Sequence, residues 1–244
     1  MPKPTFTNLP PAKRDRIIDA ALDEFAAHPL QSASVNRIVR AAGIAKGSFY
    51  QYFEGLEDLY RYLMFEHAAE LKIAVMKAAG PPPAGGDLFD TLSYYAFHGL
   101  RFGLANPRIA AAARFIRSGV AHDALAPIAR ELTVRSRVGI RHILSEGMRT
   151  GAIRGDVNLT AAVVFTDITL RVTMDEVFMD RFGVDLMALC ASPETAAAYT
   201  DDDLKDAVRV VIDLLRRGLG TGSAAGAHLD LDQLRARFDP ESAT

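Results

Sequence analysis

A short polar segment offers the clearest chemistry in this sequence. Between Ser34 and Phe53 lie hydroxyl, amide and cationic groups that can donate hydrogen bonds to phosphates and to the edges of bases. Lysine can reach a phosphate or a guanine, glutamine can pair with adenine, and glycine allows close approach to DNA. The groups that we expect to face a DNA groove are Lys46, Gly47, Ser48, Tyr50 and Gln51. On residue types alone, a structural helical corner with a polar outer face is the alternative interpretation.

Two short helices joined by a tight turn would position these groups. The first is predicted from an apolar stripe at helical spacing, formed by Val35, Ile38, Val39 and Ala42. Ser34 stands at its N-cap, and Gly43 ends it because glycine tolerates the left-handed backbone of a tight turn. Ile44 anchors the turn, and the second helix is expected over residues 46–52. Its outer face is free for the major groove, as in a helix-turn-helix. The side chains that turn back into the core are Phe49 and Phe53.

The rest of the chain is also predicted to be helical, because alternating β-branched runs are absent. An apolar stripe that includes Ile17, Leu22 and Phe25 predicts a helix that begins after Pro10-Pro11 and stops near Pro29. The glycine- and proline-rich residues 80–86 must form a loop. Further helices are expected over residues 56–79, 87–105, 107–118, 123–150, 158–182 and 200–219. The predicted fold class is therefore all-α.

Composition limits the classes of protein that the chain can belong to. The 244 residues are 49% hydrophobic and 24% charged, which is typical of a globular protein. The sequence has neither a long apolar segment nor a secretory signal, so we expect a cytoplasmic protein without membrane contact. The net charge is −2, but residues 1–52 carry seven basic and four acidic side chains, a small local excess of positive charge. Cys190, the one cysteine, is interpreted as a small buried hydrophobe, with a redox sensor as the alternative.

The motifs occur in an order that resembles a known family. They read RIIDAA over residues 16–21, FA over 25–26, SVNRIV over 34–39, AGIAKGSFYQYF over 42–53 and EDL over 57–59. This pattern is similar to the N-terminal domain of the TetR family of regulators. Beyond it, the chain resembles the family only in length and helical character. Two positions depart from the family pattern: His28-Pro29 replaces a glycine, and Leu56 replaces a lysine that grips a phosphate.

The resemblance implies a helix-turn-helix domain over residues 1–55 that binds a DNA operator. Because Leu56 replaces the lysine, one phosphate contact would be missing or would pass to Lys13, Arg14 or a backbone amide. Ser34 would contact a phosphate as well as cap its helix, and Tyr50 and Tyr52 fall at positions that usually contact phosphate. The implied DNA-binding residues are Ser34, Asn36, Ala45, Lys46, Gly47, Ser48, Tyr50, Gln51 and Tyr52.

The resemblance also implies a helical domain over residues 56–219 that binds a ligand and forms a homodimer. The helix over residues 87–105 is apolar all round, so we expect it to be central and buried. Candidate ligand-binding residues are Tyr94, Phe97, His98, Arg101, Phe115, Thr166, Asp167, Met174 and Phe178. Plain core packing is the alternative for the aromatic residues, and a hydrogen-bonded core histidine is the alternative for His98. Candidate dimer-interface residues are Val208, Val211, Ile212, Leu215 and Leu219.

The predicted function is a transcriptional repressor that a small-molecule effector releases from a near-palindromic operator. We expect the helix over residues 56–79 to couple the two domains, and residues 220–244 to form a partly disordered tail. The arginines from Arg130 to Arg154 are interpreted mostly as solvated surface, with binding of an anionic ligand such as an acyl-CoA or a carboxylate as the alternative that nothing in the sequence indicates. The alternative function is an all-helical small-molecule binding or scaffolding module whose helix-turn-helix no longer binds DNA, which Leu56 would favour.

No enzyme, cofactor or metal site is predicted. The sequence contains no phosphate-binding loop, dinucleotide fingerprint, zinc-protease motif or nucleophile elbow. The acidic run from Asp201 to Asp203 is interpreted as a complement to the dipole of the helix that it begins, rather than as metal ligands.

Overall fold

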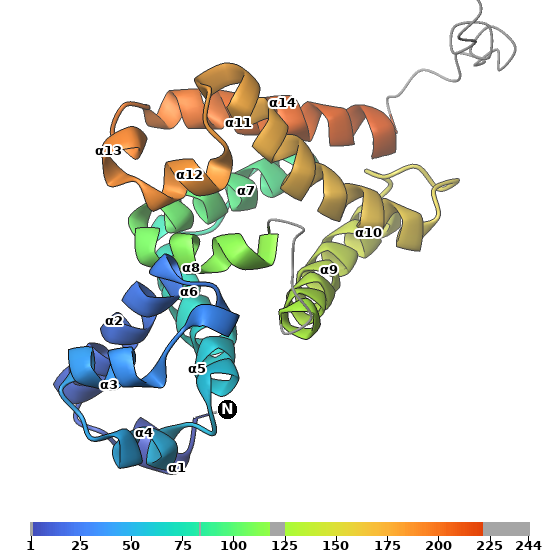
Figure 1. Cartoon of the computed structure of the whole chain (residues 1–244). Helices are drawn as coiled ribbons and strands as arrows, with labels where there is room; N and C mark the ends of the chain where they lie inside the picture. The colour runs from blue at the N-terminus through green and yellow to red at the C-terminus, as the bar shows by residue number, and fades with distance from the viewer. Residues whose placement is uncertain (1, 83, 118–124, 222–244) are drawn as a thin grey trace, which may run out of the picture.

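The computed structural model describes residues 2–82, 84–117 and 125–221, and in these ranges the chain is helical. The only extended pairing there is an isolated antiparallel bridge between Ile153 and Gly220. The all-α prediction is confirmed. Figure 1 shows a lower lobe built from the first five helices and an upper lobe built from the later ones, with α8 between them.

The lower lobe follows the predicted helices closely. It contains α1 (Pro4–Thr7), α2 (Pro11–Ala27), α3 (Val35–Ala42), α4 (Lys46–Tyr52) and α5 (Leu56–Tyr62), with a short 3₁₀ turn, η1 (Leu30–Ser32), after α2. α1 was not predicted, because four residues are too few to show helical periodicity. Its one buried side chain, Phe6, packs against Phe53 with ring centroids 4.7 Å apart.

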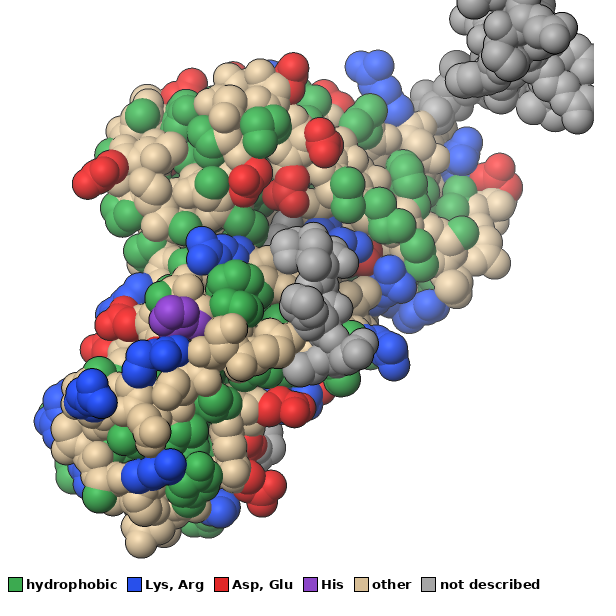
Figure 2. All heavy atoms as spheres, in the orientation of Figure 1, with side chains coloured by type: hydrophobic (Ala, Val, Ile, Leu, Met, Phe, Trp, Pro, Cys, Tyr) green, Lys and Arg blue, Asp and Glu red, His purple; other side chains and the backbone are tan. Residues whose placement is uncertain are grey.

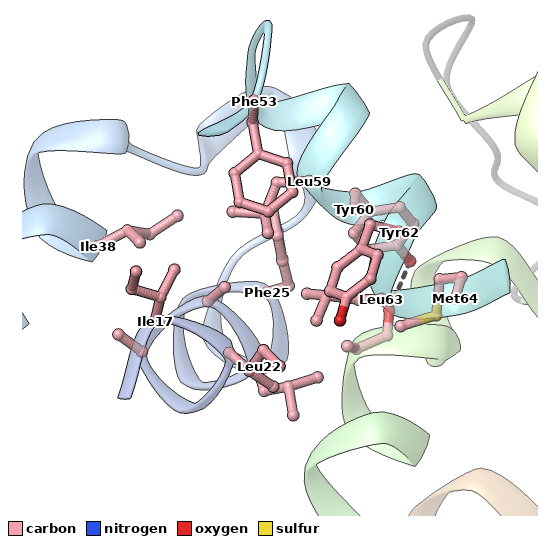
Figure 3. Packing of buried hydrophobic residues seen from close by; sticks show 14 of the residues in the cluster. Ile17, Leu22, Phe25, Ile38, Phe53, Leu59, Tyr60, Tyr62, Leu63 and Met64 are labelled. Atoms are coloured by element: carbon pink, nitrogen blue, oxygen red, sulfur yellow. Dashed lines mark hydrogen bonds between the residues drawn. The ribbon is translucent and has the colours of Figure 1, made fainter. Parts of the chain in front are cut away.

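A dense aromatic core holds the lower lobe together. Phe25 of α2 meets Tyr60 of α5 edge to face, with ring centroids 4.9 Å apart. Phe49 of α4 and Phe53, which directly follows α4, close the core. Figure 3 shows Ile17, Leu22 and Phe25 converging with side chains of α3, α5 and the turn after it. Aromatic pairs of this geometry stabilise a core beyond the area that they bury.

Two helices that we predicted to be continuous are each interrupted by a π-helical turn, so that detail was wrong. The helix over residues 56–79 is α5, then η2 (Leu63–His67), then α6 (Ala68–Ala79). The helix over residues 158–182 is α10 (Leu159–Ile168), then η3 (Thr169–Thr173), then α11 (Met174–Phe182). A π turn inserts a residue into the helical ladder, so the faces before and after it are rotated relative to each other. Apolar spacing stays helical on both sides, which hides the interruption in the sequence.

The upper lobe is built around α7 (Leu88–Ala105) and α14 (Asp201–Leu219), with α9 (Ala126–Arg149), α10, α11, α12 (Leu186–Ala191) and α13 (Pro193–Ala196) around them. α14 begins with a reciprocal cap in which the Thr200 hydroxyl accepts from the Asp203 amide and the Asp203 carboxylate accepts from the Thr200 amide. The acidic run thus occupies the first turn of α14, as predicted. Asn158 caps α10 through the Ala161 amide, also as predicted. α12 and α13 were not predicted.

α7 is not buried all round, so our prediction for it was wrong. Its buried side chains are Phe89, Leu92 and Leu100, whereas Tyr95 is 42% exposed. The helix packs against α6, α8, α12 and α14 and leaves one face towards a cavity. A helix that lines a cavity is as apolar as a buried one, and its sequence does not distinguish the two cases.

α8 (Pro107–Arg117) joins the lobes. Ile109 and Ala112 belong to the hydrophobic cluster of the lower lobe, whereas Ala110 belongs to that of the upper lobe. The lower cluster also continues past residue 55 into Leu59 and Leu63, so packing does not divide at the proposed domain boundary. Our predictions for the start of the helix at residue 123, for residue 118 and for residues 222–244 of the tail lie outside the described residues.

Candidate functional site

The turn between α3 and α4 has the geometry that a helix-turn-helix requires. The Ser34 side chain accepts a hydrogen bond from the Arg37 amide at the start of α3. Gly43 ends α3 with φ of 65° and ψ of 40°, in the left-handed region that a side chain disfavours. Ile44 packs against the lower core. The N-cap, the glycine and the anchor are therefore confirmed at the predicted residues.

An ion pair between the buried Glu24 and the exposed Arg37 fixes α3 on α2. Glu24 is 7% exposed and accepts hydrogen bonds from the Arg37 guanidinium (Nε to Oε2, 2.8 Å) and from the Ser34 amide (2.7 Å). Burial raises the pKa of the Glu24 carboxyl, but the hydrogen bonds and charge of Arg37 and the Ser34 amide outweigh burial, and the pKa lies below its ordinary value. Sequence reasoning missed Glu24, since its partners follow it by ten and thirteen residues.

The two faces of α4 have opposite roles. Phe49 is fully buried, whereas Lys46, Gly47 and Gln51 are exposed. A Cβ atom added at Gly47 would meet no heavy atom within 4 Å, so this part of α4 is open. α1 holds the other end of the helix, because Lys3 donates through its Nζ to the Tyr50 carbonyl (3.0 Å) and through its amide to the Tyr52 carbonyl (2.9 Å).

Most of the predicted DNA-binding residues lie on the surface of α3 and α4. The exposed ones are Asn36, Ala45, Lys46, Gly47, Tyr50 and Gln51, and the half-buried ones are Ser34 and Ser48. Tyr52 differs, because it is 5% exposed and its ring packs near Phe6 with the Lys13 ammonium 5.9 Å from the ring centroid. Its burial disfavours a direct phosphate contact, because the ring serves the core.

A large cavity opens between the helices of the upper lobe. Its main compartment is about 630 Å³ and lies among α7, α8, α9 and α12, and an adjoining compartment of about 620 Å³ reaches α10. Small residues at facing positions leave this space, among them Gly99 of α7, Ala113 of α8 and Gly139 of α9. Both compartments are lined by Lys72, Ala113, Ser136, Ile140 and Leu170. The volume is that of a small-molecule site.

Comparison with known proteins gives the family. A family model described as "Bacterial regulatory proteins, tetR family" matches residues 17–63, the segment that contains the helix-turn-helix. A TetR family transcriptional regulator from Chloroflexus aurantiacus J-10-fl has a crystal structure with a TM-score of 0.66 and 31% identity, and the match covers 90% of this chain and 99% of that one. The chain belongs to the TetR family.

Two other transcriptional regulators show how the similarity is distributed along the chain. The HTH-type transcriptional regulator SrpR of Pseudomonas putida is 43% identical over 60 residues, which span 24% of this chain and only 28% of SrpR. The transcriptional regulator FadR of Bacillus subtilis, solved in complex with stearoyl-CoA, has a TM-score of 0.58 at 20% identity over 84% of this chain and 98% of that one. At that identity the likeness shows the fold alone.

The cavity of this TetR protein contains few of the ligand-binding residues that we predicted. Met174 lines the main compartment and Asp167 lines the adjoining one. Phe178 and Thr166 are buried in the core, and Phe115 lies beside Arg114. The residues that lie on the other side of α7 from the cavity are Tyr94, Phe97, His98 and Arg101.

The α7 residues were assigned to the wrong face of their helix. The cavity is lined by Leu92, Tyr95, Ala96, Gly99, Leu100 and Gly103, which repeat at helical spacing. On the opposite face, Tyr94 donates to the Gly80 carbonyl (2.6 Å), and Arg101 pairs with Asp201 (2.8 Å). Burial, and after it the charge of Arg101, lowers the pKa of His98, which stacks on Tyr94 with ring centroids 4.3 Å apart. These polar groups already have partners within the chain.

The predicted interface residues of α14 also lie on the wrong face for a dimer. Val208, Val211, Ile212, Leu215 and Leu219 are at most 4% exposed and belong to the core of the upper lobe. Other large apolar side chains are exposed, on a second face of α14 and on the segment from α10 to α11. We use "exposed apolar face" for Phe165, Ile168, Val172, Met179, Val210 and Leu214, which are 39–47% exposed. Figure 2 shows hydrophobic side chains gathered on the flank where α9 and α10 lie.

Two further residues of the cavity were not singled out as ligand-binding from the sequence. Lys72 of α6 lines both compartments, and Cys190 lines the main one. Cys190 is buried, as predicted for a small hydrophobe.

No group of three or more metal-binding side chains occurs in the described part of the chain. Within the same residues, no helix is both long and apolar enough to cross a membrane.

Proposed function

We propose that this TetR-family transcriptional regulator is a homodimeric, sequence-specific repressor that a small-molecule effector releases from its operator. The exposed face of α4 carries the proposal. Lys46, Gly47 and Gln51 stand together on a helix whose other face is locked into an aromatic core. Such a helix can enter the major groove without rearrangement of the lobe that holds it.

The exposed apolar face supports the homodimer. It combines Phe165, Ile168, Val172 and Met179 from α10, η3 and α11 with Val210 and Leu214 from α14. Two long helices per subunit would form a four-helix interface related by a two-fold axis. The axis would place the two recognition helices about 34 Å apart, which matches a near-palindromic operator.

Contacts through α8 support coupling between the cavity and the DNA-binding lobe. Ile109, Ala110 and Ala113 of α8 line the main compartment. On other faces of the helix, Arg108 pairs with Asp19 (2.7 Å), and the Tyr60 hydroxyl donates to the Ala112 carbonyl (2.8 Å). Figure 3 includes this Tyr60 bond. Burial raises the pKa of Tyr60, so its hydroxyl stays a donor.

The helix that we expected to carry this coupling also touches both regions, because Lys72 of α6 lines the cavity and α5 belongs to the lower core. We therefore assign the coupling to α8 and to the segment from α5 to α6 together. An effector that binds more tightly to the conformation with misplaced recognition helices would release the operator by population shift.

Fluorescence anisotropy with the DNA upstream of the gene tests the proposal. We expect the ligand-free protein to bind this duplex at least about a thousandfold more tightly than a scrambled one, and an effector from a screened library to weaken that binding. Stearoyl-CoA, the ligand in the FadR crystal structure, belongs in the library. Equal, salt-sensitive binding to both duplexes, followed by no enrichment from random DNA, would instead indicate the module with a defective helix-turn-helix.

A further inference from the structure

The walls of the cavity carry an imbalance of charge. Lys72 lines both compartments, Arg135 lines the main one, and Arg130 lines the adjoining one. Asp167 is the only acidic side chain among the described lining residues. It is already neutralised by Arg137, at 3.0 Å, and by Arg171, at 3.9 Å. The cavity therefore presents positive charge that no carboxylate of its own walls balances.

Among the described cations around this space, Lys72 is the one that both lines the two compartments and lacks a salt bridge. It makes no hydrogen bond or salt bridge with any other residue that the structure describes. Lys72 is exposed where it borders the cavity, yet the surrounding protein removes enough water from the ammonium to lower its pKa. An ammonium in apolar surroundings is costly unless it gains a counter-charge.

Arg135 contributes a second positive group and stands between the cavity and the lower lobe. Its guanidinium donates to Glu131 (2.7 Å) and lies over the Phe65 ring, 4.4 Å from the centroid. Glu131 also accepts from Arg61 of α5. Arg135 is thus fixed in place, whereas Lys72 is available to a ligand.

The rest of the main compartment is apolar. Its walls include Leu92, Phe102, Ile109, Ile143 and Met187, and they contain few hydrogen-bonding side chains besides Lys72, Arg135, Tyr95 and Ser136. A neutral apolar ligand would fill this space but leave Lys72 unpaired. A ligand with both an apolar body and one negative group satisfies both properties of the cavity.

We infer that the cavity binds an amphipathic anion, whose negative group pairs with Lys72 and whose apolar body lies among α7, α8, α9 and α12. This inference rests on the proposed function only in taking the cavity as the effector site. The chemical class is an alkyl or aryl chain that ends in a single carboxylate or an equivalent anion. Arg135 adds a positive potential near that group without leaving Glu131.

Displacement of a neutral fluorescent probe, N-phenyl-1-naphthylamine, measures occupation of the cavity whatever the charge of the competitor. Three competitors of equal chain length are compared below their micelle concentrations: decanoate, decyl sulfate and 1-decanol. We expect both anions to displace the probe at concentrations at least about tenfold lower than 1-decanol does, since a hydrogen bond to a charged group contributes about that factor.

The variant Lys72→Met tests whether the anionic group of the ligand pairs with Lys72 or whether apolar contacts alone account for binding. The variant should lose about tenfold in affinity for decanoate and decyl sulfate, while its affinity for 1-decanol stays within about twofold. The melting temperature of the variant should stay the same or rise, because the substitution removes an unpaired ammonium from an apolar cavity. The matched control is Lys77→Met, an exposed lysine on the same helix, which should change neither affinity.

Gly99→Leu tests whether the probe reports on this cavity. A Cβ atom at Gly99 meets no heavy atom within 4 Å, so the larger side chain enters the cavity without a clash at its base. The variant should stay folded and lose binding of the probe. If the wild-type protein binds 1-decanol as tightly as decanoate, or if Lys72→Met weakens both equally, the inference is wrong.

Operator binding by the same ligand-free samples is measured in parallel. Normal operator binding without a preference for anions overturns the anion inference and leaves the proposed function standing. A preference for anions that disappears in Lys72→Met, in a protein that binds no operator, overturns the proposed function and supports the anion site.

Discussion

The two lobes of this protein are both helical, yet they use apolar side chains in different ways. In the lower lobe, Phe6, Phe25, Phe49 and Phe53 are fully buried and fill the space between short helices. In the upper lobe, α7 turns Tyr95 and Gly99 towards a cavity of about 630 Å³. A closed core presents α4 as a rigid surface, whereas an incomplete core leaves room for a ligand. Substitutions in each lobe therefore test this contrast.

The largest expected effect is on the closed core. Phe25→Ala removes a fully buried ring that meets Tyr60, and it should lower the free energy of unfolding by about 3–5 kcal/mol. Denaturation with guanidinium chloride, followed by circular dichroism, measures the loss. Tyr95→Ala is the matched control in the upper lobe, since this ring is 42% exposed and lines the cavity. Equal losses at the two sites would remove the contrast between the lobes.

The ion pair that fixes α3 should give the next largest effect. Glu24→Gln weakens charged hydrogen bonds to Arg37 and should cost about 1.5–3 kcal/mol of unfolding free energy at neutral pH. Because the pKa of Glu24 in the folded protein lies below its ordinary 4.5, this contribution is complete above pH 4.5 and is lost as the pH falls through the lower value.

Unfolding curves of both proteins at a series of pH values check the sign. The difference in free energy of unfolding between the wild type and Glu24→Gln should disappear only in acid. The control is Glu57→Gln, an exposed glutamate at the start of α5, which should change stability by a few tenths of a kcal/mol at most. A difference in free energy of unfolding that grows as the pH falls would contradict the assigned ion pair.

A smaller effect is expected at the exposed apolar face. Leu214→Asp places a charge where Leu214 is 47% exposed, outside the core of the single chain. It should raise the dissociation constant of the dimer at least about tenfold, which corresponds to about 1.4 kcal/mol, with little change in helix content. Sedimentation velocity over a range of concentrations measures the change. Ile73→Asp, at a position 54% exposed on α6, is the control and should leave the dimer intact.

The smallest change in stability is expected for a substitution at Gly47. The same substitution is the most direct test of DNA binding, because Gly47 lies on the exposed face of α4. Gly47→Ala has room for its methyl group and should stabilise α4 by about 0.5–1 kcal/mol. It should also weaken operator binding about tenfold, because the methyl group occupies the place where the backbone approaches DNA. Thermal denaturation and anisotropy measure the two quantities. Unchanged operator affinity would place Gly47 outside the interface.

The lower lobe was predictable from the sequence because its signals are local. Ser34 and Gly43 lie at the two ends of one helix, and their residue types determine a cap and a turn. The upper lobe was predictable only as a set of helices. Helical spacing shows which residues share a face, but not whether that face meets core, cavity or partner. This is why Tyr94 and His98 were assigned to the cavity in place of Tyr95 and Gly99.

The same limit explains the error on α14. Val208, Val211 and Leu215 form the stronger apolar stripe of that helix, and the stronger stripe faces its own core. Val210 and Leu214 form a thinner stripe that is harder to recognise in a sequence. Lys72 could not be assigned from the sequence, because a lysine near the end of a predicted helix is normally a surface residue.

The ion pair between Arg37 and Glu24 also has a consequence for the response of DNA binding to salt. Arg37 neutralises Glu24 and Lys3 donates to Tyr50, so neither side chain is fully available to displace ions from DNA. On α3 and α4, Arg40 and Lys46 have no salt bridge within the described residues. Two such cations per subunit would release about four counterions per dimer, so the logarithm of affinity would fall with the logarithm of salt concentration at a slope near −3.6. We expect the affinity of the operator complex to fall about 150-fold between 50 and 200 mM salt, less than for a complex with six to ten phosphate contacts.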